Sequence, residues 1–290
     1  MQSRAKLSGA EIFKEFLLIL NPSKCGSSWL AHGLTVQPYL LFPREFDFLF
    51  FLDEPPEKQW NTATAEDPEN LRIRNDPSLS RHEKLTALYT RERSKYPGVT
   101  MLIDKAPSNV LRFDRYWPLF KESKIVLLYR DPRDIWVSLE FFRQRQLGVD
   151  ERYDDIGNPS HLRESAALRM AMKNSQRVLD AENLLLHEGV PFCRITYEQL
   201  KQDYQGVLRA ILEFIGFEID ENETVVASMD PEPRTLSEHL LHAEGFRPLF
   251  RKGVVGDWRN YLSTPEAKEI VQNQAGDLLI ELGYESDAEW

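Results

Sequence analysis

The sequence is short of cysteine and has no long apolar run. Cys25 and Cys193 are its only two cysteines, and they lack the regular spacing of a disulfide framework. We therefore predict reduced thiols and a cytoplasmic location. Residues 1–16 are polar and lack the apolar core of a signal peptide. No segment approaches the roughly 20 apolar residues that cross a bilayer, so we predict no membrane segment.

The sequence also has no excess of positive charge. Its 290 residues include 46 acidic and 36 basic side chains, which gives a formal net charge of −10. This balance argues against a general nucleic-acid binder and against a protein held to anionic lipid by charge. An anionic ligand would need a local basic cluster that acts against the overall charge. No metal-ligand spacing is visible, and we predict no metal site.

Apolar residues are abundant enough for a sizeable core. Hydrophobic residues make up 42% of the chain and aromatic residues 11%, which predicts a single folded domain over 1–290. Apolar runs predict buried strands at 16–20, 100–103, 124–129 and 192–196. Amphipathic segments and helix caps predict helices at 27–36, 80–96, 110–120, 135–145, 160–188, 197–216, 220–229 and 264–283. This alternation predicts an α/β fold, with a central parallel sheet flanked by helices on both faces.

The segment from Phe16 to Leu34 has the order strand, tight loop and helix. Its loop contains Lys24, Gly26, Ser27 and Ser28. The first N–H groups of a helix have no partner within the helix, and the helix dipole is positive at that end. The glycine allows close backbone approach, the serines add hydroxyl donors and the lysine adds a full charge. The loop therefore predicts a phosphate or sulfate site.

This loop departs from the common nucleotide-binding P-loop, G-x-x-x-x-G-K-[ST]. Its lysine precedes the glycine, and the first glycine of that motif is missing, which argues against an ordinary ATP or GTP hydrolase. The order Lys24-x-Gly26-Ser27-Ser28-Trp29 resembles the 5′-phosphosulfate loop of sulfotransferases. These enzymes use 3′-phosphoadenosine 5′-phosphosulfate (PAPS) and release 3′-phosphoadenosine 5′-phosphate (PAP).

A second motif, RDPRDIWVS, begins at Arg130 and ends at Ser138. It follows a predicted strand, and ligands of open α/β sheets bind beyond the carboxyl ends of strands. The guanidinium of Arg130 is a planar, permanently charged fork that matches a phosphate. The stretch resembles the 3′-phosphate motif of sulfotransferases, RDPRD-x-x-x-S.

A third motif, RKGVVGDW, begins at Arg251 and continues with Lys252 and Gly253. Two adjacent cations and a glycine can surround a phosphate with side chains and main-chain N–H groups. A solvated basic loop is the plainer interpretation. The segment resembles the sulfotransferase RKGxxGDW element, and the agreement at several positions favours the phosphate-binding interpretation.

Two aromatic residues extend the resemblance to the adenine ring of the donor. Tyr197 lies in ITYEQL, which is similar to the Tyr-Glu-x-Leu element of the family, where the tyrosine meets the adenine. Trp29 matches the adenine-stacking aromatic of the family, and an indole offers a flat face to a purine. A tyrosine at a helix start is by itself more often a packing residue.

The resemblance covers about residues 16–283 and implies a P-loop-like sulfotransferase fold. It implies that Lys24 stabilises the leaving group, and that side-chain cations make a metal unnecessary. The donor-binding residues that it implies are Lys24, Cys25, Gly26, Ser27, Ser28, Trp29, Arg130, Ser138, Tyr197, Arg251, Lys252 and Gly253. For Cys25 we prefer a small filler residue to an activated thiol, because no histidine partner lies at motif spacing.

The general base is the least defined residue of the site. Cytosolic members of the family use a His in a Lys-Thr-His context, whereas this chain has Asp104-Lys105-Ala106-Pro107 in that position. The stretch resembles the Glu-Lys-Ser-Pro of heparan sulfate sulfotransferases. The resemblance implies Asp104 as the base, which takes the proton of the acceptor, and Lys105 as a second catalytic cation. A helix cap or an ion pair is the plainer role for Asp104, and His32 is the reserve base.

Segments 37–99 and 220–248 match no motif and are expected to recognise the acceptor. The aromatic stretch 39–52 either fills the core or forms the wall of an acceptor pocket. Residues 53–79 are rich in proline and acidic residues and are expected to form a surface loop. We expect a small-molecule acceptor with a hydroxyl, or less readily an amine, and the aromatic stretch 39–52 suggests an aromatic or apolar molecule. The oligomeric state stays open.

Two other functions fit parts of the sequence. A magnesium-dependent nucleotide kinase also uses a phosphate loop on a parallel sheet, but it needs a GK[ST] ending and a magnesium-binding carboxylate after a strand. Neither feature is evident. A catalytically silent PAP-binding protein would retain the fold and the site, and the intact Lys24, Arg130 and Arg251 argue against such decay.

Overall fold

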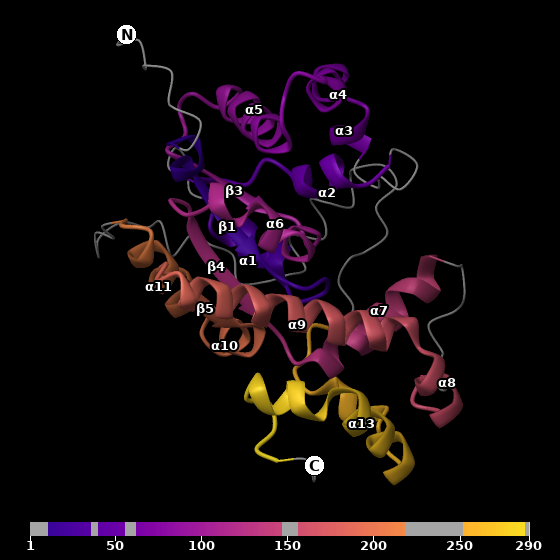
Figure 1. Ribbon diagram of the computed structural model, residues 1–290. Helices are drawn as coiled ribbons and strands as arrows, with labels where there is room; N and C mark the ends of the chain where they lie inside the picture. The colour runs from indigo at the N-terminus through magenta and orange to yellow at the C-terminus, as the bar shows by residue number, and fades with distance from the viewer. Residues whose placement is uncertain (1–10, 36–39, 56–61, 147–155, 218–251, 288–289) are drawn as a thin grey trace.

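The computed structural model shows how the predicted elements are arranged (Figure 1). It describes residues 11–35, 40–55, 62–146, 156–217, 252–287 and 290. The helix predicted at 220–229, the segment 220–248 and Arg251 lie outside the described residues.

A five-stranded parallel sheet forms the centre of the fold. Its strands are β2 (Leu40–Leu41), β3 (Met101–Lys105), β1 (Phe16–Leu20), β4 (Lys124–Tyr129) and β5 (Cys193–Thr196), in the order β2-β3-β1-β4-β5. The four predicted strands are all present, and β2 adds a short edge strand that the sequence analysis did not predict. The α/β prediction is therefore confirmed.

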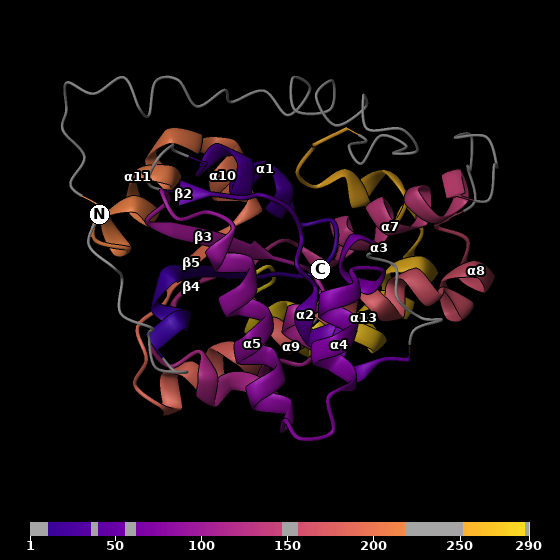
Figure 2. The same ribbon diagram turned by 90° about the horizontal axis from the view of Figure 1, so that it is seen from above.

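Helices cover both faces of the sheet (Figure 2). One face packs against α1 (Ser27–Gly33), α10 (Tyr197–Gln202) and α11 (Tyr204–Phe214). The other face packs against α2 (Phe48–Asp53), α5 (Arg81–Ser94) and α9 (Ala166–His187). Every residue of β1 is buried, and its side chains alternate between these two clusters because strand residues point to opposite faces. The continuous apolar run of β1 thus reflects burial on both sides.

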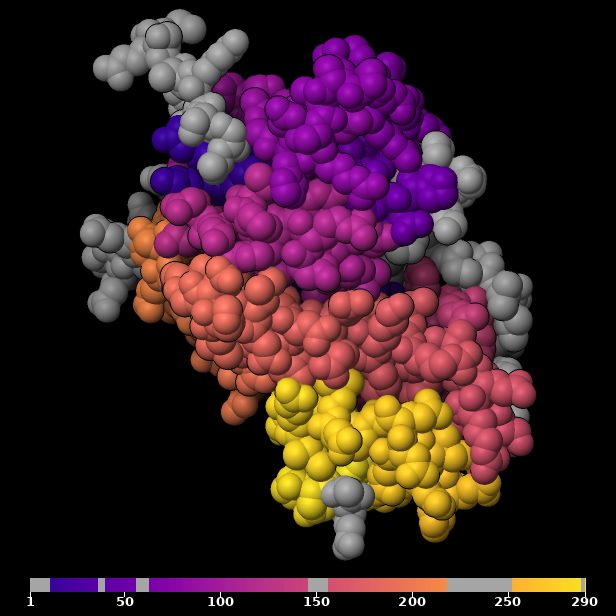
Figure 3. All heavy atoms as spheres, viewed as in Figure 1, coloured from indigo at the N-terminus to yellow at the C-terminus, as the bar shows by residue number. Residues whose placement is uncertain are grey.

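A third apolar cluster joins the C-terminal part of the chain to the sheet layers. It contains side chains of α7 (Pro132–Gln146), α8 (Pro159–Glu164), η5 (Asp257–Asn260) and α13 (Pro265–Glu281). In the space-filling view α13 and the C-terminus pack beneath α9, at the end opposite α5 (Figure 3).

Helix caps agree with the sequence at three predicted starts. Ser80 and Glu83 form a capping box at α5, and Thr196 and Gln199 form another at α10. Thr264 caps α13, whose first residue is a proline.

Three predicted elements are wrong in their extent. The helix predicted at 160–188 is two helices, because Ser165 ends α8 in an extended conformation and then caps α9. The helix predicted at 110–120 is three short helical pieces, η3 (Asn109–Leu111), α6 (Phe113–Tyr116) and η4 (Trp117–Leu119).

The surface loop predicted at 53–79 contains two helices, α3 (Thr62–Ala65) and α4 (Pro68–Asn75). Asp67 accepts hydrogen bonds from the backbone N–H groups of Glu69 and Asn70, and a proline follows it at the first helical position. The acidic and proline residues that suggested a loop are therefore the start signal of a helix.

Candidate active site

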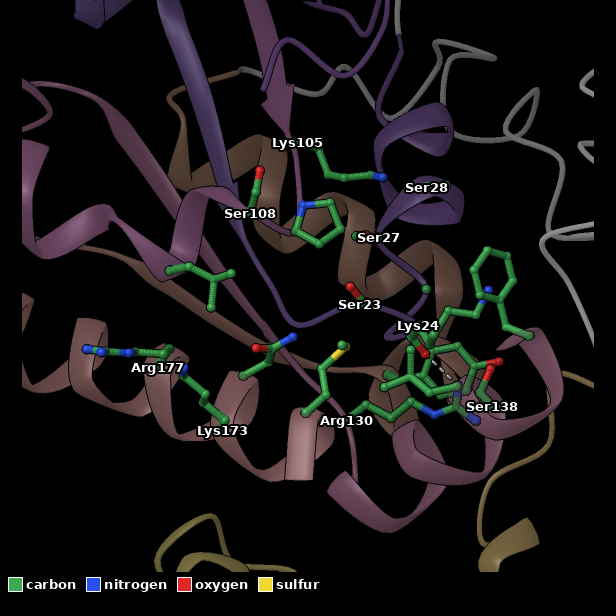
Figure 4. Close-up of a pocket in the computed structure, with 18 of the residues that line it drawn as sticks. Ser23, Lys24, Ser27, Ser28, Lys105, Ser108, Arg130, Ser138, Lys173 and Arg177 are labelled. Carbon is green, nitrogen blue, oxygen red and sulfur yellow. Dashed lines mark hydrogen bonds between the residues drawn. The ribbon is translucent and has the colours of Figure 1, made fainter. Parts of the chain in front are cut away.

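The carboxyl ends of four parallel strands bring the predicted site residues together. Lys24 follows β1, Lys105 ends β3, Arg130 follows β4 and Tyr197 follows β5. All four line one cavity with a volume of about 1710 Å³ (Figure 4). Because parallel strands end at one edge of the sheet, residues distant in sequence meet there.

The loop after β1 depends on two residues with left-handed backbone conformations. Lys24 has φ 65° and Gly26 has φ 87°, and Gly26 is the N-cap residue of α1. Gly26, Ser27 and Ser28 line the cavity. A left-handed lysine is uncommon, and it turns the chain sharply between β1 and α1.

The ammonium group of Lys24 is surrounded by other cations. Burial first, and then the positive charges of Arg145, Arg130 and Lys105, lower its pKa from 10.5 to about 8. Its Nζ lies 4.1 Å from the centre of the Phe142 ring. A bound anion would relieve this repulsion and raise the pKa of the ammonium.

Cys25 is buried, and its thiol is not activated as a nucleophile. Burial raises the pKa of its thiol from 9.0 to about 11, and hydrogen bonds with Ser27 lower that pKa only in part. The thiol is therefore protonated near neutral pH, which fits the filler role. Both Cys25 and Cys193 are free, as predicted.

Arg130 connects three segments of the site. Its Nη1 donates to the carbonyl oxygen of Lys24 at 2.8 Å, and its Nη2 donates to the carbonyl oxygen of Val254 at 3.1 Å. The guanidinium carbon lies 4.3 Å from the centre of the Tyr197 ring. Its Nε is buried and has no hydrogen-bond partner among the described residues.

The other charged residues of the RDPRD motif, Asp131, Arg133 and Asp134, do not line the cavity and instead stabilise the fold. Asp134 accepts from the backbone N–H groups of Gly256 at 2.7 Å and Trp258 at 3.0 Å. Arg133 pairs with Asp131, and its guanidinium carbon lies 3.8 Å from the centre of the Trp258 ring. These contacts fasten the RKGVVGDW segment to α7.

The described part of RKGVVGDW reaches the cavity from the side of α7. Lys252, Gly253 and Val254 line the cavity, as does Ser138 of α7. Gly253 has φ 64°, and a Cβ atom there would lie 3.5 Å from the hydroxyl of Tyr197. The predicted 3′-phosphate residues Arg130, Ser138, Lys252 and Gly253 therefore lie on one cavity.

Trp29 and Tyr197 form an aromatic corner of the cavity. Their rings meet edge to face, with centroids 6.3 Å apart. Trp29 also stacks on Tyr204, with centroids 4.6 Å apart and ring planes 11° apart. The stack fixes the indole, and both predicted adenine-contacting residues line the cavity.

Lys105 is buried and forms an ion pair with Glu45. Glu45 lies in the connection between β2 and α2 and lines the cavity. Glu45 was not predicted as a site residue, because it lies inside the aromatic stretch 39–52. The only available sign of a role in the site was that this carboxylate directly follows Pro43 and Arg44 in an otherwise apolar stretch.

The rest of that stretch packs in the core. Phe46, Phe48 and Phe51 are fully or almost fully buried among Phe16, Tyr89 and other core rings. None of these three rings lines the cavity. The core-filling interpretation of 39–52 is therefore confirmed for Phe46, Phe48 and Phe51.

Asp104, the predicted base, lies on the other face of β3. Its carboxylate is fully buried and accepts a hydrogen bond from the Tyr89 hydroxyl. Burial raises its pKa from 3.8 to about 7, and the Tyr89 hydrogen bond opposes that rise. Asp104 does not line the cavity. Neither does the reserve base His32, whose ring packs on Phe42 and whose pKa is lowered first by burial and then by Lys105.

A model of the sulfotransferase family matches residues 17–221. The chain belongs to the sulfotransferase family. This assignment agrees with the resemblance seen in the loop after β1 and in the motif that starts at Arg130. It sets aside the nucleotide-kinase alternative.

Relatives of known name are distant sulfotransferases. Sulfotransferase 2A2 of Rattus norvegicus is 25% identical over 159 residues, which cover 51% of this chain and 53% of the relative. Sulfotransferase 6B1 of Homo sapiens is 22% identical over 276 residues, which cover 88% of this chain and 73% of the relative. The chain spans about half the length of sulfotransferases 2A2 and 2B1 of rat and mouse.

Solved sulfotransferase structures share the fold. Mouse sulfotransferase SULT7A1 complexed with PAP superimposes with a TM-score of 0.51 at 16% identity, covering 97% of this chain and 90% of the other. The sulfotransferase domain from the curacin biosynthetic pathway gives 0.51 at 20% identity, covering 90% and 96%. The sulfotransferase fold with its P-loop-like centre is thereby confirmed. No helix in the described residues is both long and apolar enough to cross a membrane.

Proposed function

We propose that this family member transfers a sulfuryl group from PAPS to a hydroxyl of a small-molecule acceptor. The observation that supports this most is the meeting of Lys24, Lys105, Arg130 and Tyr197 at four strand ends, around one cavity. An anionic donor fits their chemistry, because three of the four bring positive charge into a partly buried space.

The residues present fit the donor. Lys24, Cys25, Gly26, Ser27, Ser28 and Trp29 form the loop that would hold its 5′-phosphosulfate. Arg130, Ser138, Lys252 and Gly253 would hold the 3′-phosphate, together with Arg251, which lies outside the described residues. The unpartnered Nε of Arg130 is a donor that such a ligand could satisfy. Trp29 and Tyr197 would contact the adenine.

PAPS would supply an activated sulfuryl group, whose bond to the bridging oxygen breaks as the acceptor oxygen attacks the sulfur. The electron pair of that bond goes to the bridging oxygen, which becomes part of the 5′-phosphate of PAP. Lys24 and Lys105 carry the charge that stabilises this oxygen. Lys24 lies in the loop after β1 and Lys105 ends β3, so the fold positions both cations before the reaction, and positioning and charge provide the catalysis.

Glu45 is the better-placed general base. Its carboxylate lines the cavity and contacts Lys105, whereas Asp104 is buried against Tyr89 on the other face of β3. A base must come within hydrogen-bond reach of the acceptor hydroxyl whose proton it takes. We therefore propose Glu45 for this role and a supporting role in the fold for Asp104.

Part of the segment that is expected to recognise the acceptor lines the cavity. Glu45, Asp53 and Glu54 all belong to 37–99 and line the cavity. We propose one sulfotransferase domain over 1–290, with 37–99 and 220–248 on the acceptor side. We also expect the protein in the cytoplasm, because both cysteines are free and structural disulfides are rare there.

Turnover measurements on paired variants test the function and the base. The assay follows PAP formation from PAPS with a panel of phenols and aliphatic alcohols. Glu45→Gln should lower kcat at least about 100-fold with little change in PAP affinity, because a general base contributes roughly 10²–10⁴. Asp104→Asn should retain turnover within about fivefold, as should Glu182→Gln, an ion-paired carboxylate outside the cavity.

If Asp104→Asn is inactive and Glu45→Gln is active, the general base is Asp104 and not Glu45. A wild-type protein that binds PAP but forms none with any acceptor would favour the silent PAP-binding alternative.

A further inference from the structure

The cavity carries far more positive than negative charge. Eleven lysine and arginine side chains line it, against three carboxylates. The whole chain has a net charge of −10, so this excess is a local feature and not a property of the surface in general. Cations that lie close together repel one another, and a bound anion reduces this electrostatic repulsion.

The donor residues account for only part of this charge. Another part lies on α9, where Arg169, Lys173 and Arg177 follow one another at intervals of four residues and all line the cavity. Residues four apart lie on the same face of a helix. We call these three side chains the α9 basic stripe.

The stripe lines a part of the cavity that is distant from the donor loop. Figure 4 shows Lys173 and Arg177 on α9, on the far side of the view from Ser138 and Lys24. A cavity of about 1710 Å³ exceeds the roughly 300–1,000 Å³ of a typical pocket for one ligand. It therefore has room for a second molecule beside the donor.

Carboxylates of the described residues neutralise little of the charge of the stripe. Elsewhere in the cavity lining, Arg112 pairs with Glu54 and Arg115 with Asp53, so these cations are already compensated. Lys173 has no acidic partner among the described residues. Arg169 donates to backbone carbonyl oxygens, and Arg177 has only a 3.6 Å contact with the half-exposed Asp180.

Asn174 provides a second, independent observation. It lies next to Lys173 on the cavity side of α9, is 7% exposed and lines the cavity. No hydrogen bond to its side chain is found within the described residues. Its amide atoms are not enclosed in the core, so they remain open to a ligand that enters the cavity.

We propose that the acceptor carries an anionic group in addition to the hydroxyl that receives the sulfuryl group. The α9 basic stripe holds this anion, which is a carboxylate, sulfate or phosphate, and Asn174 donates to it. Leu111, Leu139 and Met170, which also line the cavity, contact the apolar part of the same molecule. This inference rests on the proposed sulfotransferase activity and names the substrate class of the same site.

The first experiment measures binding without turnover. 8-Anilinonaphthalene-1-sulfonate, an apolar monoanion, is titrated by fluorescence into the full chain at saturating PAP and 150 mM salt. The Lys173→Gln/Arg177→Gln variant should bind the probe at least tenfold more weakly than wild type, because charge-assisted contacts are lost. Its matched control is Arg209→Gln/Lys268→Gln, which also removes one arginine and one lysine charge but at positions outside the cavity. This control should change the dissociation constant of the probe less than twofold.

The second experiment compares matched acceptors in the PAP-formation assay. Hydroxy acids such as 3-(4-hydroxyphenyl)propionate are paired with their methyl esters. Wild type should prefer the acids by at least tenfold in kcat/KM, and the stripe variant should lose this preference while its activity on the esters stays within threefold.

The inference is overturned if wild type does not bind the probe, or if the stripe and control variants bind it equally. It is also overturned if the stripe variant weakens PAP binding tenfold, since the stripe would then belong to the donor site. Failure of PAP to bind wild type would instead contradict the proposed function, and the probe titration without PAP would still report on the stripe.

Discussion

A Cβ atom added to Gly26 would lie 2.6 Å from Cδ2 of Tyr197, so the donor loop packs directly against the residue after β5. Gly26 also has φ 87°, a conformation that residues with a side chain rarely adopt. A glycine is therefore needed there for two separate reasons. The contact sets the position of the loop relative to the aromatic corner of the cavity.

Gly26→Ala should weaken PAP binding at least tenfold and destabilise the fold by about 2–4 kcal/mol, from strain and overpacking together. Gly216→Ala separates the two causes, because Gly216 has φ 88° but nothing within 4 Å of an added Cβ. It should cost only about 1–2 kcal/mol. Gly98→Ala, at an exposed site without contacts, should change stability by less than about 0.5 kcal/mol. Calorimetry and urea unfolding measure these effects, and equal PAP affinity in Gly26→Ala would refute the role of the contact.

Asp134 should be needed to hold the RKGVVGDW segment at the cavity. Asp134→Asn weakens two hydrogen bonds from backbone N–H groups, and we expect a loss of about 1–3 kcal/mol in stability and of at least tenfold in PAP affinity. Asp67→Asn is the matched control, since Asp67 also accepts from two backbone N–H groups but lies outside the cavity. It should lower stability by about 1 kcal/mol and leave PAP binding unchanged. Equal loss of affinity in both variants would show that only stability matters.

PAP affinity should fall as the pH rises above 8. The pKa of Lys24 is about 8 without ligand, and a bound anion raises it, so binding takes up a proton between the two values. The dissociation constant should therefore rise by up to about tenfold per pH unit in that range. Lys24→Met should bind weakly at pH 7 and show a flat profile to pH 9.5, whereas Lys268→Met should keep the wild-type profile. A sloping profile in Lys24→Met would assign the proton to another group.

Stability should depend on pH through Asp104. Burial raises the pKa of this carboxyl from 3.8 to about 7, so the folded state holds a proton that the unfolded state has released. Folding stability from this group is therefore greatest at low pH and falls as the pH rises from about 4 to 7. The wild type should lose on the order of 1–4 kcal/mol between pH 4 and pH 8 relative to Asp104→Asn. Urea unfolding of both proteins at the two pH values checks this, and parallel pH profiles would contradict it.

The sequence was sufficient for most of the fold because the central strands β1, β3 and β4 are buried along almost their whole length. An apolar run such as Phe16–Leu20 has no polar alternation to confuse it with a half-exposed strand, and a glycine-containing loop marks its end. The two-residue β2 could not be predicted, because two residues give no periodicity. The break at Ser165 was hidden because a serine inside an amphipathic pattern is common, and its capping contact depends on the chain turning there.

The donor side of the site was predictable because it follows from local motifs at strand ends. Arg130 and Tyr197 come directly after β4 and β5, so the parallel topology alone brings them together. The acceptor side was not predictable in this way. Glu45 meets Lys105 through a contact between residues 60 positions apart, which no local motif indicates. Asp104 faces away from the cavity because alternate residues of β3 face opposite sides of the sheet. The α9 basic stripe likewise acquires a meaning only once the cavity is known.

The most direct test of the account is calorimetric titration of PAP into wild type and Arg130→Gln, with Arg209→Gln as the exposed control. We predict one tight site in wild type and in the control. In Arg130→Gln we predict an affinity roughly 10- to 100-fold lower, because the phosphate loses a charge-assisted contact. An absence of binding to wild type, or equal affinity in all three proteins, would contradict the assignment of this cavity to the sulfuryl donor.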